Sequence, residues 1–470
     1  MKLHKFRGQD VSMITSREHR IGNTIFVCLS VDETNNSIYI YDKLLLKIIN
    51  ILNNSKHPFR ARQHDDQHYY YTTTKSEILA RQIVKIIDYE PTHLELGQML
   101  IDEDLTFIYR IYKNNIYMAS THLFFDGIQF GKCVQYITDK DFFDLKLIPD
   151  FKYYPIITEL SILPSIFKMI VNMPKRNLSY DVSWKTNRMP HCIKKYIFEL
   201  SDFMLFKRYL ETCFDNKIGF STVMSILCTL FILEYTDKNK ITIGLVSAFN
   251  NPKRFNNFAA CTININRSKN WNKINNIEKI QNIAKQIIYS LEQYGKAQSL
   301  LIYLITNIYE LNFYANNYVD CLISGFPSRF PILYNNKPVI ITGVELLGTS
   351  MPMYIGYGSS NNQMRIFINS RSYDIKLKDD TPFILDSLLE DIKKTQKSES
   401  DINDISINNK SKRTKTFLFK LGILLIPIIP LVIWKYKPTY STLFNKYLQY
   451  GNIFLKKSYD IFYIPKLYKF

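Results

Sequence analysis

Apolar runs separated by polar turns predict alternating strands and helices over most of the chain. Apolar residues recurring every three or four positions predict helices, and short runs rich in β-branched and aromatic residues predict strands. Strands are expected at 23–31, 105–119 (a hairpin), 196–200, 241–247, 261–265, 338–346, 353–357 and 364–369. Helices are expected at 42–50, 77–87, 128–137, 201–210 (with Ser201 as N-cap), 221–235, 271–294, 300–311 and 383–394. The pattern therefore predicts an α/β protein.

The pattern also divides the chain. Residues 149–174 are apolar and punctuated by proline without a clear period, which is typical of a connector between two lobes. We expect an N-terminal lobe at 1–175 and a C-terminal lobe at 176–396. A basic polar linker at 397–416, an apolar segment at 417–434 and a basic aromatic tail at 435–470 follow.

The C-terminal tail predicts attachment to a membrane. Leu421–Trp434 contains no charge, but it is shorter than the roughly twenty residues of a spanning helix and carries Pro427 and Pro430. A true span, a kinked or re-entrant anchor and a soluble docking helix all remain open. Beyond it, apolar and aromatic residues fall largely on one helical face, with lysines elsewhere, as in an interfacial helix.

Charge and cysteine content narrow the setting of the protein. The formal net charge is +18, and residues 405–470 hold twelve Lys or Arg and one acidic residue. Basic charge beside apolar sequence favours anionic lipid over nucleic acid, for which no binding motif is present. The seven cysteines are scattered, so neither disulfides nor a zinc site is expected, and no signal peptide is visible. We expect an intracellular, membrane-associated protein with its lobes on the reducing side.

The stretch Tyr117–Gly127 contains the strongest candidate chemistry. Here an apolar strand leads into His122, three apolar residues, Asp126 and Gly127, and a helix follows. Buried imidazole and carboxylate groups are costly without partners, but the imidazole can take a proton near neutral pH. An isolated histidine at this place would be read as a satisfied core residue. The Asp-Gly pair at this offset favours a catalytic histidine instead.

This stretch resembles the His-x-x-x-Asp-Gly signature of the CoA-dependent acyltransferase superfamily, in particular its wax ester synthase/diacylglycerol acyltransferase branch. Thr121 stands where a second histidine is common. The resemblance implies a two-lobed fold like that of chloramphenicol acetyltransferase, with mixed sheets flanked by helices, a tunnel between the lobes and His122 as general base. It further implies that Asp126 pairs with an arginine, for which Arg60 is the best match, and that Gly127 permits the turn and close approach of the acyl donor.

A second stretch, Cys321–Ser328, is similar to the Ser-Asn-x-Pro-Gly turn of the same branch. Gly325 and Ser328 depart from that pattern. The resemblance implies a substrate-channel turn that includes Ser324, Gly325 and Pro327. The Asp-Phe-Gly-Trp-Gly motif of the plant branch is missing, which disfavours that branch.

Together these observations predict a membrane-associated O-acyltransferase. It would move an acyl group from acyl-CoA, its co-substrate, to a hydroxyl acceptor such as a long-chain alcohol or diacylglycerol. No bound cofactor and no metal are expected. The alternative is a structural or interaction protein that keeps the fold without turnover. A peptide-synthetase condensation module is disfavoured because the chain shows no carrier-protein segment.

Overall fold

The computed structural model describes residues 2–6, 24–32, 36–138, 176–179, 192–248, 255, 258–292, 319–326, 333–347 and 352–400. The chain divides into two units, 1–405 and 406–470. All described residues belong to the first unit, so the predicted segments 417–434 and 435–470 lie outside them, as does the predicted helix 300–311. No helix among the described residues is long and apolar enough to cross a membrane.

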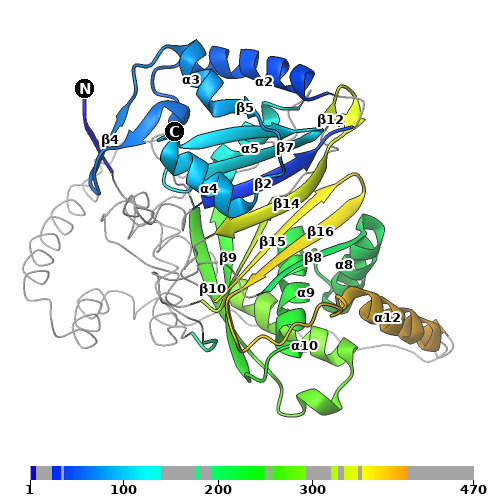
Figure 1. Ribbon diagram of the computed structural model, residues 1–470. Helices are drawn as coiled ribbons and strands as arrows, with labels where there is room; N and C mark the ends of the chain where they lie inside the picture. Colours follow the sequence, from blue (N-terminus) through cyan, green and yellow to red (C-terminus); the bar gives the residue numbers. More distant parts are fainter. Residues whose placement is uncertain are drawn as a thin grey trace, which may run out of the picture. The chain divides into compact units, whose positions relative to one another are not determined.

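A five-stranded mixed sheet organises the first part of the chain (Figure 1). Its strands, in spatial order, are β14 (Ile340–Leu347), β2 (Thr24–Ser30), β7 (Asn115–Thr121), β6 (Phe107–Tyr112) and β5 (Val84–Ile86). All neighbours are antiparallel except β5 and β6, which are parallel. Strand β7 is therefore central, and its inner residues are buried.

Helices cover both faces of this sheet. They are α2 (Ser37–Leu52), α3 (Ser76–Ile83), α4 (His93–Asp102) and α5 (Gly127–Gln135). The Tyr109 hydroxyl donates to the carbonyl of Cys133, which fixes α5 on one face. His93 of α4 stacks on Phe26 at 5.1 Å between ring centroids, on the opposite face. Because side chains alternate along a strand, the helices bury both faces of β7.

A six-stranded sheet organises the second part. Its strands, in spatial order, are β10 (Phe258–Asn266), β9 (Lys240–Ala248), β11 (Cys321–Phe326), β15 (Met353–Ser360), β16 (Gln363–Ser370) and β8 (Cys192–Glu199). Strand β11 is parallel to β9 and β15, and the other pairs are antiparallel. One face packs against α8 (Leu200–Phe214), α9 (Phe220–Glu234), α10 (Asn276–Ser290) and α12 (Leu385–Ser400) (Figure 1).

Strand β14 connects the two sheets. It comes from the second half of the sequence, but it pairs with β2 at the edge of the five-stranded sheet. Val344 of β14 lies directly over Gly356 of β15, and the backbone nitrogen of Ile341 donates to Ser360 Oγ at 3.1 Å. Two small sheets, β1–β4–β3 (His4–Lys5, His68–Tyr71, Ala61–Gln63) and β12–β13 (Leu333–Tyr334, Lys337–Pro338), and the 3-10 turns Pro58–Arg60 and Trp271–Lys273 complete the described structure.

The predicted α/β class with mixed sheets flanked by helices is confirmed, and several element boundaries are corrected. The predicted helix 77–87 ends at Ile83, because Val84–Ile86 pairs with β6 as a strand. The predicted helix 271–294 is a 3-10 turn followed by α10. Ser201 is not an N-cap, since α8 begins at Leu200 directly after β8. Helix α12 continues to Ser400, past the expected start of the linker at 397.

Candidate active site

His122 lies at the end of the central strand of the five-stranded sheet. Strand β7 ends at Thr121, and a tight turn follows in which the backbone nitrogen of Phe124 donates to the carbonyl of Thr121 at 3.2 Å. His122 is half-buried within this turn. The hydroxyls of Ser120 and Thr121 are buried and have no hydrogen-bond partner among the described residues. The end of β7 thus carries three polar residues in succession, and the side chains of Ser120 and Thr121 point to opposite faces of the sheet.

Asp126 connects this turn to helix α5. It is the N-cap of α5, where its Oδ1 accepts from the backbone nitrogen of Gln129 at 2.9 Å, and the side chain is 1% exposed. A carboxylate at this place satisfies a free helix N–H and interacts favourably with the helix dipole. Asp126 therefore fixes the geometry of the turn that carries His122.

The apolar residues between His122 and Asp126 anchor the turn to its surroundings. The Phe125 ring packs against Phe59 and Phe107, with centroids 5.7 and 5.1 Å away. The Phe124 ring makes an edge contact with Phe255, a residue of the second half, at 5.0 Å. These aromatic contacts, worth about 0.5–1.5 kcal/mol each beyond burial, hold the turn on both sides.

Gly127 does not have the role that was predicted for it in the turn. It is the first residue of α5, it is exposed, and its φ angle is not in the left-handed region. No heavy atom of the described residues lies within 4 Å of the position that a Cβ would occupy. The turn therefore does not require glycine, although a ligand could approach the backbone there.

The predicted ion pair between Arg60 and Asp126 is corrected by the structure. Arg60 is buried, and its guanidinium is bonded elsewhere. Nε donates to the carbonyl of Leu52 at 2.8 Å, Nη1 to those of Thr72 and Thr74 at 3.2 and 2.7 Å, and Nη2 to Ser76 Oγ at 2.9 Å. Arg60 thus satisfies backbone carbonyls at the end of α2 and in the loop before α3. The sequence could not reveal this, since it shows the charge but not the carbonyls around it.

Ser324 and Gly325 do not form a turn. They lie in β11, an inner strand of the six-stranded sheet, and Pro327 lies outside the described residues. An added Cβ at Gly325 would stand 2.1 Å from the ring of Tyr357 on β15. Glycine is therefore needed here for the close packing of that ring. The structure places these residues on a different sheet from His122.

One histidine beside the site was not singled out by the sequence. His57 Nδ1 accepts from the backbone nitrogen of Phe59 at 3.2 Å, and its ring contacts Phe59 edge-on. Burial, with Lys132 and Arg60 nearby, lowers the pKa of His57 to about 4. His57 is therefore neutral at pH 7 and supports the packing of Phe59.

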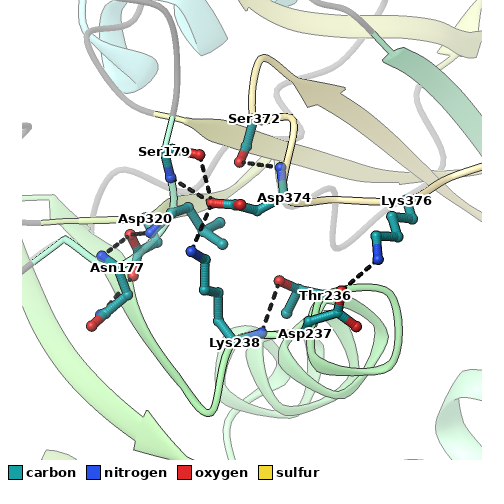
Figure 2. Close-up of polar contacts among 10 residues, drawn as sticks. Asn177, Ser179, Thr236, Asp237, Lys238, Asp320, Ser372, Asp374 and Lys376 are labelled. Carbon is teal, nitrogen blue, oxygen red and sulfur yellow. Dashed lines mark hydrogen bonds and ion pairs between the residues drawn. The ribbon is translucent and has the colours of Figure 1, made fainter.

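A second buried carboxylate, Asp320, was also missed. It accepts from the backbone nitrogens of Asn177 and Leu178 at 2.6 and 2.7 Å (Figure 2). It also accepts from the backbone nitrogen of Thr242 at 2.7 Å and from Asn177 Nδ2 at 3.1 Å. Burial raises the pKa of Asp320 in spite of these bonds. In the same region Asp374 accepts from the backbone nitrogen and hydroxyl of Ser179. Both carboxylates fasten residues 177–179 to the second half of the chain, which is a structural role.

No cluster of His, Cys, Asp or Glu suited to a metal occurs among the described residues.

Comparison with known proteins places this geometry in a fold. No family model and no curated protein matches the chain. Among solved structures, it is similar to the trichothecene 15-O-acetyltransferase of Fusarium sporotrichioides (TM-score 0.53, 10% identity, 85% of this chain and 94% of that one). It is also similar to the first condensation domain of the calcium-dependent antibiotic synthetase, solved with a substrate analogue (TM-score 0.53, 10% identity, 83% of this chain and 94% of that one). A third similar structure is the epimerization domain of the third module of tyrocidine synthetase B (TM-score 0.51, 12% identity, 84% of this chain and 95% of that one).

These similarities extend over nearly the whole of each compared chain, so they include both sheets. The protein therefore has the fold of the condensation domains and of this acetyltransferase, as the resemblance of the His122 stretch implied. At this level of identity the similarity establishes the fold, and the activity has to be argued from the site.

Proposed function

We propose that this protein is an acyltransferase in which His122 is the general base. The observation that carries the proposal is the position of His122. It is half-buried at the end of the central strand β7, in a turn that Asp126 locks to helix α5. In a fold that also serves an acetyltransferase, this is a rigid site for a group that must take up and return a proton.

The reaction follows from the chemistry of a neutral imidazole. A ring nitrogen of His122 takes the proton of the acceptor hydroxyl while the oxygen attacks the thioester carbonyl carbon. The tetrahedral oxyanion collapses, the carbon–sulfur bond breaks, and the imidazolium returns the proton to the departing thiolate. The products are an ester and a free thiol, without a covalent acyl-enzyme. General-base assistance of this kind contributes roughly 10²–10⁴ in rate.

Asp126 would act through position and charge and not by touching the substrate. Because Arg60 is bonded elsewhere, we assign the arginine partner of Asp126 to Arg62, which is buried in β3, two residues after Arg60. Arg62 Nη1 donates to the carbonyls of Phe59 and Ala61 at 2.9 and 2.7 Å. The packing of Phe59 on Phe125 keeps this strand beside the Asp126 turn. A buried carboxylate is best satisfied by such a charge-assisted partner.

For the substrates, we propose acyl-CoA as donor and a lipidic hydroxyl compound as acceptor, as in the wax ester synthase/diacylglycerol acyltransferase branch. The basic aromatic tail at 435–470 and the apolar segment at 417–434 support membrane attachment, because an apolar acceptor is concentrated there. We propose an intracellular location on the reducing side, which the scattered cysteines favour.

The direct test is an acyl-transfer assay with purified full-length protein, radiolabelled acyl-CoA of several chain lengths and a neutral lipid extract. Label in an ester product would support the proposal and identify the acceptor class. Absence of transfer over the whole panel, from protein that is folded by circular dichroism, would favour the alternative of a binding protein without turnover.

A further inference from the structure

The six-stranded sheet has one apolar and one polar face. Along β16, Met364, Ile366 and Ile368 pack into the core beneath the helices. Phe367, which points the other way, belongs to the core of the five-stranded sheet. Because side chains alternate, Asn369 lies on the same face as Phe367 and is turned toward the five-stranded sheet.

The carboxamide of Asn369 is buried without a partner. The side chain is 6% exposed, and neither Oδ1 nor Nδ2 forms a hydrogen bond with any described residue. Buried side-chain amides are nearly always hydrogen-bonded, since desolvation is not otherwise compensated. Such an exception is expected where a bound molecule completes the site.

The strand registers place Asn369 toward the His122 end of the molecule. Asn369 pairs with Tyr354 on β15, two residues before Gly356, over which Val344 lies. Ile341, three residues before Val344, contacts Ser360, four residues after Gly356, so β14 and β15 run in opposite directions. The last residue of β14, Leu347, therefore lies at the same end of the sheets as the start of β15. Leu347 is paired with Thr24, and Thr24 with Thr121, the residue before His122.

We propose that Asn369 is a substrate-binding residue that hydrogen-bonds a polar group next to the reacting centre. This rests on the proposed acyl transfer. A carboxamide offers a donor and an acceptor side by side, so it suits a group that also offers both, namely a hydroxyl or a secondary amide. A hydroxyl would belong to the acceptor and an amide to the pantetheine arm of the donor. If Asn369 binds a hydroxyl of the acceptor, an alcohol with a second hydroxyl is a good acceptor and a plain long-chain alcohol is a poor one.

Two isosteric substitutions test this, each removing a buried polar group without a described partner. Asn369→Leu removes the carboxamide. Thr229→Val is the matched control, because Thr229 Oγ1 on α9 is buried without a partner on the opposite, helix-covered side of the same sheet. Both variants should melt at the wild-type temperature or roughly 1–3 °C above it, because each loses an uncompensated polar group. Only Asn369→Leu should change substrate use.

The assay compares 1-dodecanol with 1,2-dodecanediol as acceptors and acetyl-CoA as donor. If Asn369 binds the acceptor, wild type prefers the diol by about tenfold or more in kcat/KM, and Asn369→Leu loses that preference. If it binds the donor, the KM for acetyl-CoA rises about tenfold with both acceptors. Unchanged constants, or a melting temperature of Asn369→Leu well below wild type, would overturn the proposal.

A binding measurement separates this proposal from the catalytic one. The melting temperature of His122→Ala and of the double variant with Asn369→Leu is followed with acetyl-CoA or the diol, which requires no turnover. If the ligand raises the melting temperature of His122→Ala by more than that of the double variant, the role of Asn369 is supported even if transfer is absent. Equal rises, or none with either compound, reject it.

Discussion

Two stretches carry a glycine where the resemblance to acyltransferases implied a site, and the structure uses them in opposite ways. Gly127 follows Asp126 at the start of a helix, with no described atom near its missing side chain. Gly325 lies in an inner strand, with the Tyr357 ring occupying the place of its side chain. A glycine can leave space for a ligand or for a neighbouring side chain, and only the structure distinguishes the two. The His122 stretch therefore remains the candidate site, whereas Gly325 is a packing position.

The largest expected change in stability comes from Arg60, which the resemblance implies as the partner of Asp126 in the His122 stretch. Arg60→Met leaves three backbone carbonyls and the Ser76 hydroxyl without their donor, which should cost roughly 3–5 kcal/mol of unfolding free energy. Below the melting temperature its acyl transfer should be near wild type, whereas Arg62→Gln should lower transfer at least about tenfold. Urea unfolding and initial rates measure both. The reverse pattern would restore Arg60 as the partner of Asp126.

The packing of His57 on Phe59 should make the stability of the protein depend on pH. Its pKa is lowered to about 4 in the folded protein, below the ordinary value of 6.5, so the unfolded state binds the proton more readily. Stability is therefore complete above pH 6.5 and falls as pH decreases toward 4, by at most about 3 kcal/mol. His57→Gln should remove this part of the pH dependence. Urea unfolding between pH 7 and 4 measures it, and parallel curves for the two proteins would contradict the assignment.

The two glycines themselves give the next effect. Gly325→Ala should destabilise the protein by about 1–3 kcal/mol, since the Tyr357 ring must move. Gly127→Ala should stabilise it by roughly 0.5 kcal/mol, because alanine is the better residue in a helix. If the acyl donor passes close to residue 127, the KM for the donor should nevertheless rise. Thermal unfolding of the two variants measures both stability changes. A Gly325→Ala protein as stable as wild type, or a Gly127→Ala protein that is clearly destabilised, would contradict the comparison.

A stability effect smaller than that of Gly325→Ala is expected at the cap formed by Asp126. Asp126→Ala removes the bond to Gln129 and should cost about 0.5–2 kcal/mol, whereas Asp126→Ser keeps a capping oxygen and should restore most of that loss. Transfer activity should stay low in both variants, because neither has the charge. Full activity in Asp126→Ser would show that capping alone is the role of Asp126.

Much of the fold could be predicted from local pattern. The hairpin at 105–119, the helices near 42–50 and 221–235 and the strands from 338 to 369 have strong periodicity, and each is present. The errors have a common cause in tertiary context. Val84–Ile86 continues a helical pattern, yet pairing with β6 makes it a strand. The segment Cys321–Phe326 contains glycine like a turn, yet two parallel neighbours hold it as a strand.

The candidate site was only partly predictable. The order of His122, Asp126 and Gly127 between a strand and a helix is local, and the structure has that arrangement. The partners of Arg60, the environment of His57 and the orphan carboxamide of Asn369 depend on residues distant in sequence. No local signal marks them.

The most direct measurement is the rate of acyl transfer by His122→Ala, with wild type and His64→Ala, an exposed histidine, for comparison. We expect a fall of roughly 10²–10⁴ in kcat for His122→Ala, with an almost unchanged melting temperature, and no change for His64→Ala. A His122→Ala protein that turns over like wild type, or that unfolds, would contradict the claim that His122 is the base.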